Sequence, residues 1–177
     1  MCNSRGAMPE FCRMNTPSGF PGGPSAAAPG LTYVFSLRGE LAPPVEQGHI
    51  DGRRKRFIPV TGGQVHGARL QGRLLPGGGD WQAIGTDGLT CVLARYFIEA
   101  DDGAVIGVTN TGVRTASPEV TDRITQGVAV GPDDYYFRTS PVFDVPPGPH
   151  EWLRRRLFVA RGIRMPDHVI VDFYVVD

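Results

Sequence analysis

The sequence predicts an all-β protein whose strands form a single antiparallel β-barrel closed on itself, crossed by one short helix. The chain has 177 residues, of which 24 are Gly and 16 are Pro, and both residues disfavour long helices. Short stretches of alternating apolar and polar residues follow one another with turn residues between them. Because no helical pattern alternates with these stretches, an antiparallel barrel is favoured over a parallel α/β sheet.

The N-terminal segment 1–30 is rich in Gly, Pro and Ala and poor in side chains that pack, so we expect a disordered tail followed by one domain at 31–177. The tail lacks the continuous apolar run of a secretory signal, and the chain has no apolar run of about 18 residues. We therefore expect a cytoplasmic protein without a membrane partner. Lys plus Arg equals Asp plus Glu, at 18 each, which argues against nucleic acid as the main partner.

Strands are expected wherever side chains alternate with a period of two residues. Asp-Gly at 102–103 supplies the positive φ of a tight turn, so the segments on either side of it should pair as a hairpin. A barrel closed by eight or nine strands has an interior just large enough for side chains or for one small ligand. The predicted strands are 31–41, 65–75, 91–99, 104–111, 135–143, 157–163 and 168–176.

One helix is predicted after the hairpin. Ser117 is a suitable N-cap, Pro118 suits the first helical position, and Glu119 complements the positive end of the helix dipole. Gly127 is a suitable terminator. These signals predict a short helix that connects two strands.

The segment Pro76–Trp81 contains three consecutive glycines before an acid. A phosphate-binding loop is excluded because it requires Gly-Lys-Ser/Thr at the start of a helix, and Asp80 would repel phosphate. Two interpretations remain open. The segment is either a wide turn whose Trp81 plugs one end of the barrel, or a pocket mouth where Asp80 is an acid and Trp81 a stacking surface.

Arg95 lies in a strand between Leu93 and Phe97. We favour an inward orientation, in which the buried guanidinium must pair with a carboxylate such as Asp80 or with an anionic ligand. In the alternative, Arg95 is a solvated charge on the outer face. The same question applies to Tyr136 and Arg138, which share one face of a strand and either hold the oxygens of a ligand or belong to an ordinary structural strand.

Other kinds of site have little support. The four histidines lie in separate segments and the three cysteines show no Cys-x-x-Cys spacing, so we expect no metal and no disulfide framework. The fingerprints of dinucleotide binding and of a serine nucleophile elbow are absent, so no cofactor is expected. The basic run at 53–56 is interpreted as a solvated loop.

Several motifs resemble, in order, the family known as domain of unknown function 3237. They are 56–63, 67–72, 76–81, 94–96, 135–139 and Trp152-Leu153, and the resemblance extends from Leu31 to the C-terminus. It implies a compact barrel of the calycin or lipocalin type without an established activity. Asp80, Trp81, Arg95, Tyr136 and Arg138 match recurrent motif positions. Arg154 departs from the family pattern, which usually has Asn there.

We hypothesise that the barrel binds a small, oxygenated, aromatic molecule. The first alternative is a cofactor-independent isomerase, cyclase or lyase, and the second is a structural or oligomerisation module whose barrel is filled by apolar side chains. A homo-oligomer is compatible with each. The candidate catalytic residues are Asp80, Arg95 and Tyr136, and the candidate ligand contacts are Trp81, Tyr96, Arg138 and Trp152.

Overall fold

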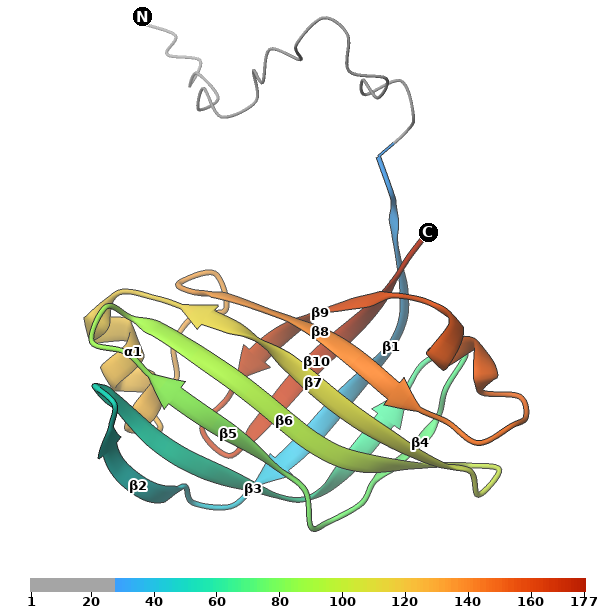
Figure 1. The fold of residues 1–177 in the computed structure, drawn as a ribbon, viewed down its shortest axis with the longest axis horizontal. Coiled ribbons are helices and arrows are strands. Elements are labelled where there is room, and N and C mark those ends of the chain that lie inside the picture. Colours follow the sequence, from blue (N-terminus) through green and yellow to red (C-terminus); the bar gives the residue numbers. More distant parts are fainter. Residues whose placement is uncertain (1–27) are drawn as a thin grey trace, which may run out of the picture.

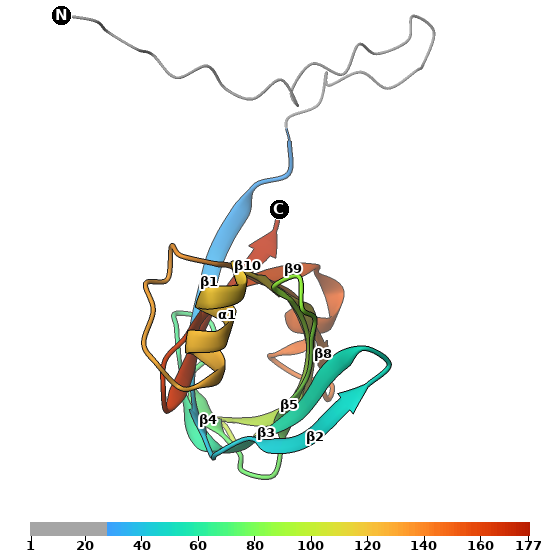
Figure 2. The same ribbon diagram turned by 90° about the vertical axis from the view of Figure 1, so that its left-hand side faces the viewer.

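The structure is a computed structural model that describes residues 28–177, so the predicted tail at 1–30 lies, except for its last three residues, outside the described residues. The described chain folds into one antiparallel sheet that curls into a barrel (Figures 1 and 2). Its strands are β1 (Leu31–Leu41), β2 (Val45–Ile50), β3 (Arg53–His66), β4 (Gly72–Leu74), β5 (Gly79–Ile84), β6 (Leu89–Ala100), β7 (Val105–Thr115), β8 (Tyr136–Asp144), β9 (Phe158–Arg164) and β10 (His168–Val176).

The barrel closes through eight strand positions. The neighbours run β1-β10-β9-β8-β7-β6, and β4 and β5 share the position between β6 and β3. Pairing of β1 with the second half of β3 completes the ring, while β2 forms a hairpin with the first half of β3, on the edge of β3 opposite β5. The predicted all-β closed barrel is confirmed.

Strands were predicted correctly where a short turn sequence connects two neighbouring strands. The hairpin of β6 and β7 forms around 101–103, and Gly103 adopts a φ of 84°. The predicted strand 65–75 is wrong: β3 ends at His66 and the chain turns back so that Val65 pairs with Gly72 of β4. The alternation of that segment therefore spans a strand end, a loop and a second strand. The basic run at 53–56 begins β3 and is not a loop.

The predicted helix is confirmed as α1 (Pro118–Thr125), which connects β7 to β8. The Ser117 side chain accepts a hydrogen bond from the Val120 amide at 3.3 Å, and Gly127 has a φ of 75° after the last turn. Ile124 packs against Val92 and Phe137 inside the barrel. Figure 2 shows α1 at one end of the barrel, so the helix covers part of that opening.

The barrel interior differs between its two ends. Toward the short 3₁₀ helix η2 (Glu151–Arg155) the interior is a packed aromatic core, in which the rings of Phe35 and Phe173 stack 4.5 Å apart. Figure 1 shows η2, coloured orange-red, at the end opposite α1. Toward α1, by contrast, charged and polar side chains are buried. Because burying charge is costly, this end holds the candidate site.

Candidate functional site

Strand alternation brings polar side chains from several strands into the barrel near α1. On β3 the inward row that includes Ile58 and Val60 begins with Arg56, and on β7 the row that includes Val108 ends with Arg114. Successive side chains of a strand point to opposite faces, so each of these arginines must share the interior with its apolar neighbours. Arg56 is 2% exposed and Arg114 is 1% exposed.

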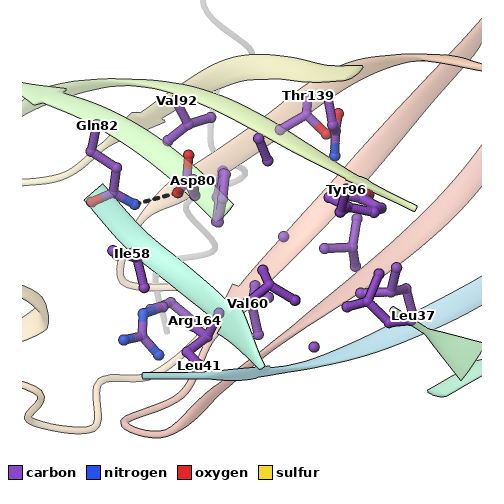
Figure 3. Close-up of a pocket in the computed structure, with 18 residues that line it drawn as sticks. Leu37, Leu41, Ile58, Val60, Asp80, Gln82, Val92, Tyr96, Thr139 and Arg164 are labelled. Carbon is purple, nitrogen blue, oxygen red and sulfur yellow. Dashed lines mark hydrogen bonds between the residues drawn. The ribbon is translucent and has the colours of Figure 1, made fainter. Parts of the chain in front are cut away.

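A cavity lies in the same part of the barrel. Its volume is about 60 Å³. Its wall combines apolar side chains, which include Leu37, Leu41, Ile58, Val60, Val92 and Val171, with polar and charged ones, which are Asp80, Gln82, Tyr96, Asn110, Thr139 and Arg164. Asp80 and Gln82 both belong to β5. Figure 3 shows these two side chains joined by a hydrogen bond, with Arg164 and Tyr96 lining the same cavity. Arg56 and Arg114 lie beside this cavity without lining it.

Two hydrogen bonds connect Arg56 to Asp80 through Gln82. The Arg56 Nε donates to Gln82 Oε1 at 2.9 Å, and Gln82 Nε2 donates to Asp80 Oδ2 at 2.6 Å. Arg56 also donates from Nη1 to the carbonyl oxygen of Thr125 in the last turn of α1, at 3.4 Å. The helix thus supplies an acceptor at the negative end of its dipole.

Arg164 is anchored by the strand ends around it. Its Nη1 donates to the carbonyl oxygen of His168 at 2.9 Å and its Nη2 to that of Pro166 at 3.3 Å, and these two bonds hold the guanidinium. The backbone amide of Arg164 donates to the Tyr135 hydroxyl at 2.9 Å.

The cluster carries more positive than negative charge. Asp80 is the acid whose charge acts on Arg56, Arg114 and Arg164 alike. Within residues 28–177, none of these three arginines has a carboxylate oxygen within the 4.0 Å of an ion pair. The interior near α1 therefore favours an added anion.

Burial shifts the protonation equilibria of the cluster. Desolvation raises the pKa of Asp80, although the Gln82 hydrogen bond and the charges of Arg114 and Arg56 act in the opposite direction. Desolvation, assisted by the charge of Arg56, lowers the pKa of Arg114 to about 10. Burial also raises the pKa of Tyr96. Shifts of this kind, in several groups around one cavity, are typical of functional sites.

Buried polar atoms without a hydrogen-bond partner gather at the same place. They include Arg56 Nη2, Asp80 Oδ1, Arg114 Nε and Nη1, and Arg164 Nε, together with side-chain oxygens of Tyr96, Asn110 and Thr139. In the described part of the chain, the other such atoms are Thr121 Oγ1 and His150 Nδ1. An unpaired buried polar group costs about 1–3 kcal/mol, so this concentration needs a functional reason.

Comparison with known proteins places the chain in a family. The family described as "Protein of unknown function (DUF3237)" matches residues 29–176. The chain belongs to the DUF3237 family. A UPF0311 protein of Clostridium acetobutylicum is similar to this DUF3237 chain, with 38% identity over 143 residues that cover 80% of this chain and 90% of that protein.

Solved structures of similar chains share the barrel. A conserved protein of unknown function from Rhodopseudomonas palustris has a TM-score of 0.80 and 34% identity, covering 86% of this chain and 99% of that one. A beta-barrel like protein from Acinetobacter baumannii has a TM-score of 0.75 and 33% identity, covering 88% and 100%. An enzyme from Penicillium herquei, at 21% identity and a TM-score of 0.66 over 88% and 99%, shares the fold alone.

Of the DUF3237 motif residues predicted for the site, Asp80 and Tyr96 line the cavity and Arg95 does not. The prediction that Arg95 points inward and pairs with Asp80 is wrong, because Arg95 is exposed on the outer face of β6. Residues directly opposite each other in a sheet share a face, and Arg95 is opposite Gly79 while Asp80 is opposite Ala94. Arg56, Arg114 and Arg164 surround Asp80 in place of Arg95.

The remaining predicted residues lie away from the cavity. Trp81 is 42% exposed on the outer face of β5, where its ring packs against Phe57, so it neither plugs the barrel nor stacks at the cavity mouth. Tyr136 and Arg138 lie on the outer face of β8 and line a separate surface groove. Trp152 lies in η2 at the opposite end, with the Arg69 guanidinium 3.8 Å from its ring.

Sequence reasoning missed Arg56, Gln82, Arg114 and Arg164. For Arg56 a signal existed, because it continues the alternating row of Ile58 and Val60. No local signal identified the others, since their role depends on which strands are neighbours.

Two broad observations complete the description of the site. The described chain has no helix long and apolar enough to cross a membrane. Among residues 28–177, no group of three or more His, Cys, Asp or Glu side chains is arranged to hold a metal ion.

Proposed function

We propose that the barrel binds a small, largely apolar and aromatic molecule that carries an acidic oxygen, such as a carboxylate or a phenolate. The observation that carries this proposal is a group of three arginines around one acid, each with a buried nitrogen that has no partner; Arg56 and Arg114 are fully buried and Arg164 is partly buried. A negatively charged oxygen near Arg164 would offset the positive charge of the three guanidinium groups and accept a hydrogen bond from Arg164. The apolar side chains of the cavity wall would contact the rest of the molecule.

The cavity also argues against the alternative of a purely structural barrel. That alternative predicts an interior filled by apolar side chains. A volume of about 60 Å³ is several times the roughly 10–15 Å³ that one water molecule requires. A module selected for stability alone would have little reason to keep buried arginines beside such a cavity.

The proposal is tested with benzoate and benzyl alcohol, which have similar size and differ in charge. We expect calorimetric titration to show binding of benzoate and much weaker binding of benzyl alcohol. Arg164→Met should abolish the preference for benzoate, because the guanidinium at the cavity wall is lost. Arg138→Met is the matched control, since it removes an arginine from the outer face. Equal binding of both compounds, or an equal effect of both substitutions, would refute the proposal.

A second candidate function is catalysis, as a cofactor-independent isomerase, cyclase or lyase. The observation in its favour is Asp80, a cavity acid whose pKa is raised by burial and whose Oδ1 has no partner. Such a carboxyl can exchange a proton with a substrate, while Arg164 stabilises the charge on an enolate oxygen. Arg164 thereby takes the role that the sequence assigned to Arg95 and Tyr136.

The catalytic candidate is tested with the small molecule that co-purifies with the protein. We expect its slow conversion without added cofactor, followed by mass spectrometry and chromatography. Asp80→Asn should stop conversion and keep binding, because Asn retains the shape of the side chain and cannot transfer the proton. Conversion at the wild-type rate by Asp80→Asn would exclude this role.

A further inference from the structure

Gln82 joins Arg56 to Asp80 through two hydrogen bonds in series, and its side chain is itself buried at 4% exposure. The two bonds use opposite ends of the amide. The oxygen accepts from Arg56 and the nitrogen donates to Asp80 Oδ2. Asp80 Oδ1 has no partner in this arrangement.

The orientation of this amide follows from the chemistry of arginine. A guanidinium carries donors only and keeps its proton in proteins, so the atom of Gln82 that faces Arg56 Nε must be the acceptor oxygen. A flipped amide would set two donors against each other. The Gln82 nitrogen is therefore directed at Asp80, and Oδ2 must act as an acceptor.

The protonation of Asp80 then has one favourable form. A proton on Oδ2 would point at the N–H of Gln82, whereas a proton on Oδ1 leaves the short Gln82 bond intact. We propose that Arg56 and Gln82 are positioning residues that place the exchangeable proton of Asp80 on Oδ1. The inference rests on the proposed function in one respect, because it specifies that the ligand presents an acceptor oxygen, a carboxylate or carbonyl, to Oδ1.

The surroundings of Asp80 support this arrangement. The charged or titratable groups that face it are Arg56 on β3, Tyr96 on β6, Arg114 on β7 and Arg164 on β9. The Gln82 hydrogen bond, the charges of Arg114 and Arg56 and the backbone amide of Leu93 favour the carboxylate, but burial favours the neutral acid more strongly, so the pKa of Asp80 is raised. With the proton on Oδ1, both Asp80 and Arg164 are donors. A ligand that offers only acceptor oxygens then matches the site.

Infrared spectroscopy of the ligand-free protein tests the position of the proton. The C=O stretch of protonated Asp80 is identified as the band that a pH change produces in the wild-type protein and not in Asp80→Asn. If the proton is on Oδ1, the carbonyl is Oδ2, and its stretch is lowered by the Gln82 hydrogen bond. Gln82→Met removes that bond, so we expect the band to move to higher wavenumber. Gln64→Met, at an exposed position of β3, is the matched control and should leave the band unchanged.

Gln82→Glu provides a second variant if Gln82→Met folds poorly. Its carboxylate keeps a partner for Arg56 and lacks the donor for Oδ2, so the band should again move upward. The midpoint of the Asp80 titration should also rise, because the new charge repels the Asp80 carboxylate. A purely structural role for Gln82 would change the melting temperature and leave the band in place. An unmoved band in the folded variants would overturn the proposal.

Binding of benzoate is measured on the same proteins, so that the two proposals fail separately. If wild-type protein does not bind benzoate and the band moves as expected, the proposed function fails and the positioning of the proton stands. If benzoate binds and the band does not move, the ligand site stands and the role of Gln82 is refuted.

Discussion

Replacing Arg114 by methionine should stabilise the ligand-free protein. Arg114 is 1% exposed, two of its guanidinium nitrogens have no partner, and Arg56 repels it. Methionine has a similar length and carries no charge, so it fills the same space without the cost of desolvation.

The lowered pKa of Arg114 sets the magnitude. The fall of the Arg114 pKa from the ordinary value of an arginine to about 10 is worth about 3 kcal/mol, at about 1.36 kcal/mol per pKa unit. For a base whose pKa is lower in the folded state, this cost is absent at a pH above the ordinary pKa of arginine. It grows as the pH falls to 10 and is fully present at neutral pH. The substitution also removes the 3.4 Å bond to the buried hydroxyl of Thr90, at a cost of about 1 kcal/mol.

The expected net gain in the free energy of unfolding is therefore about 2 kcal/mol at neutral pH. For a domain of this size that is a rise in melting temperature of roughly 4–8 °C. Urea denaturation and calorimetry of ligand-free protein measure both quantities. Arg138→Met, on the outer face, should change the free energy of unfolding by less than about 0.5 kcal/mol. A loss of about 3 kcal/mol or more in Arg114→Met would refute the reasoning, because it would show that Asp80 compensates the buried charge.

Three further predictions follow from the site and the domain boundary. We compare the free energy of unfolding of the wild-type protein with that of Asp80→Asn. The wild-type value should fall relative to the Asp80→Asn value as the pH rises above 3.8. The raised pKa makes the neutral acid the favoured form in the folded state, and this advantage is lost as the pH passes the folded-state pKa. Denaturation over a pH series measures it, and a rising difference would contradict it. Deletion of residues 1–27 should leave the melting temperature unchanged, because their composition favours few buried contacts, and a drop of more than a few degrees would show otherwise. Elemental analysis should find no stoichiometric transition metal, and one tightly held zinc per chain would return the histidines to consideration.

Local signals in the sequence predicted the parts of the fold that depend on neighbouring residues. Ser117, Pro118 and Gly127 determine where α1 begins and ends, and the Asp-Gly turn determines the hairpin of β6 and β7. These features require only a few consecutive residues, so they could be recognised without knowing the rest of the structure.

The orientation of Arg95 could not be predicted because both faces of β6 are apolar. Leu93 and Phe97 point outward, while Val92 and Ile98 point inward. The alternation of side chains along such a strand does not identify which face points into the barrel. The pairing register of β6 with β5 is needed to identify the inner face.

The arginines of the site could not be predicted for a different reason. Arg56, Arg114 and Arg164 come from three strands that are separated by about fifty residues in sequence, and closure of the barrel brings them together. Asp80 was recognised as a site residue from its glycine-rich surroundings, but its partners were not.

The most direct test of the account is to search for a small molecule that co-purifies with the protein and to identify it. Native mass spectrometry of wild-type protein, followed by release and analysis of the bound compound, is compared with Arg164→Met and with Arg138→Met. The account predicts a compound with a carboxylate or phenolate group, retained by wild-type protein and Arg138→Met and lost from Arg164→Met. A compound without an acidic oxygen, retained equally by all three proteins, would contradict the claim that the buried arginines form an anion-binding site.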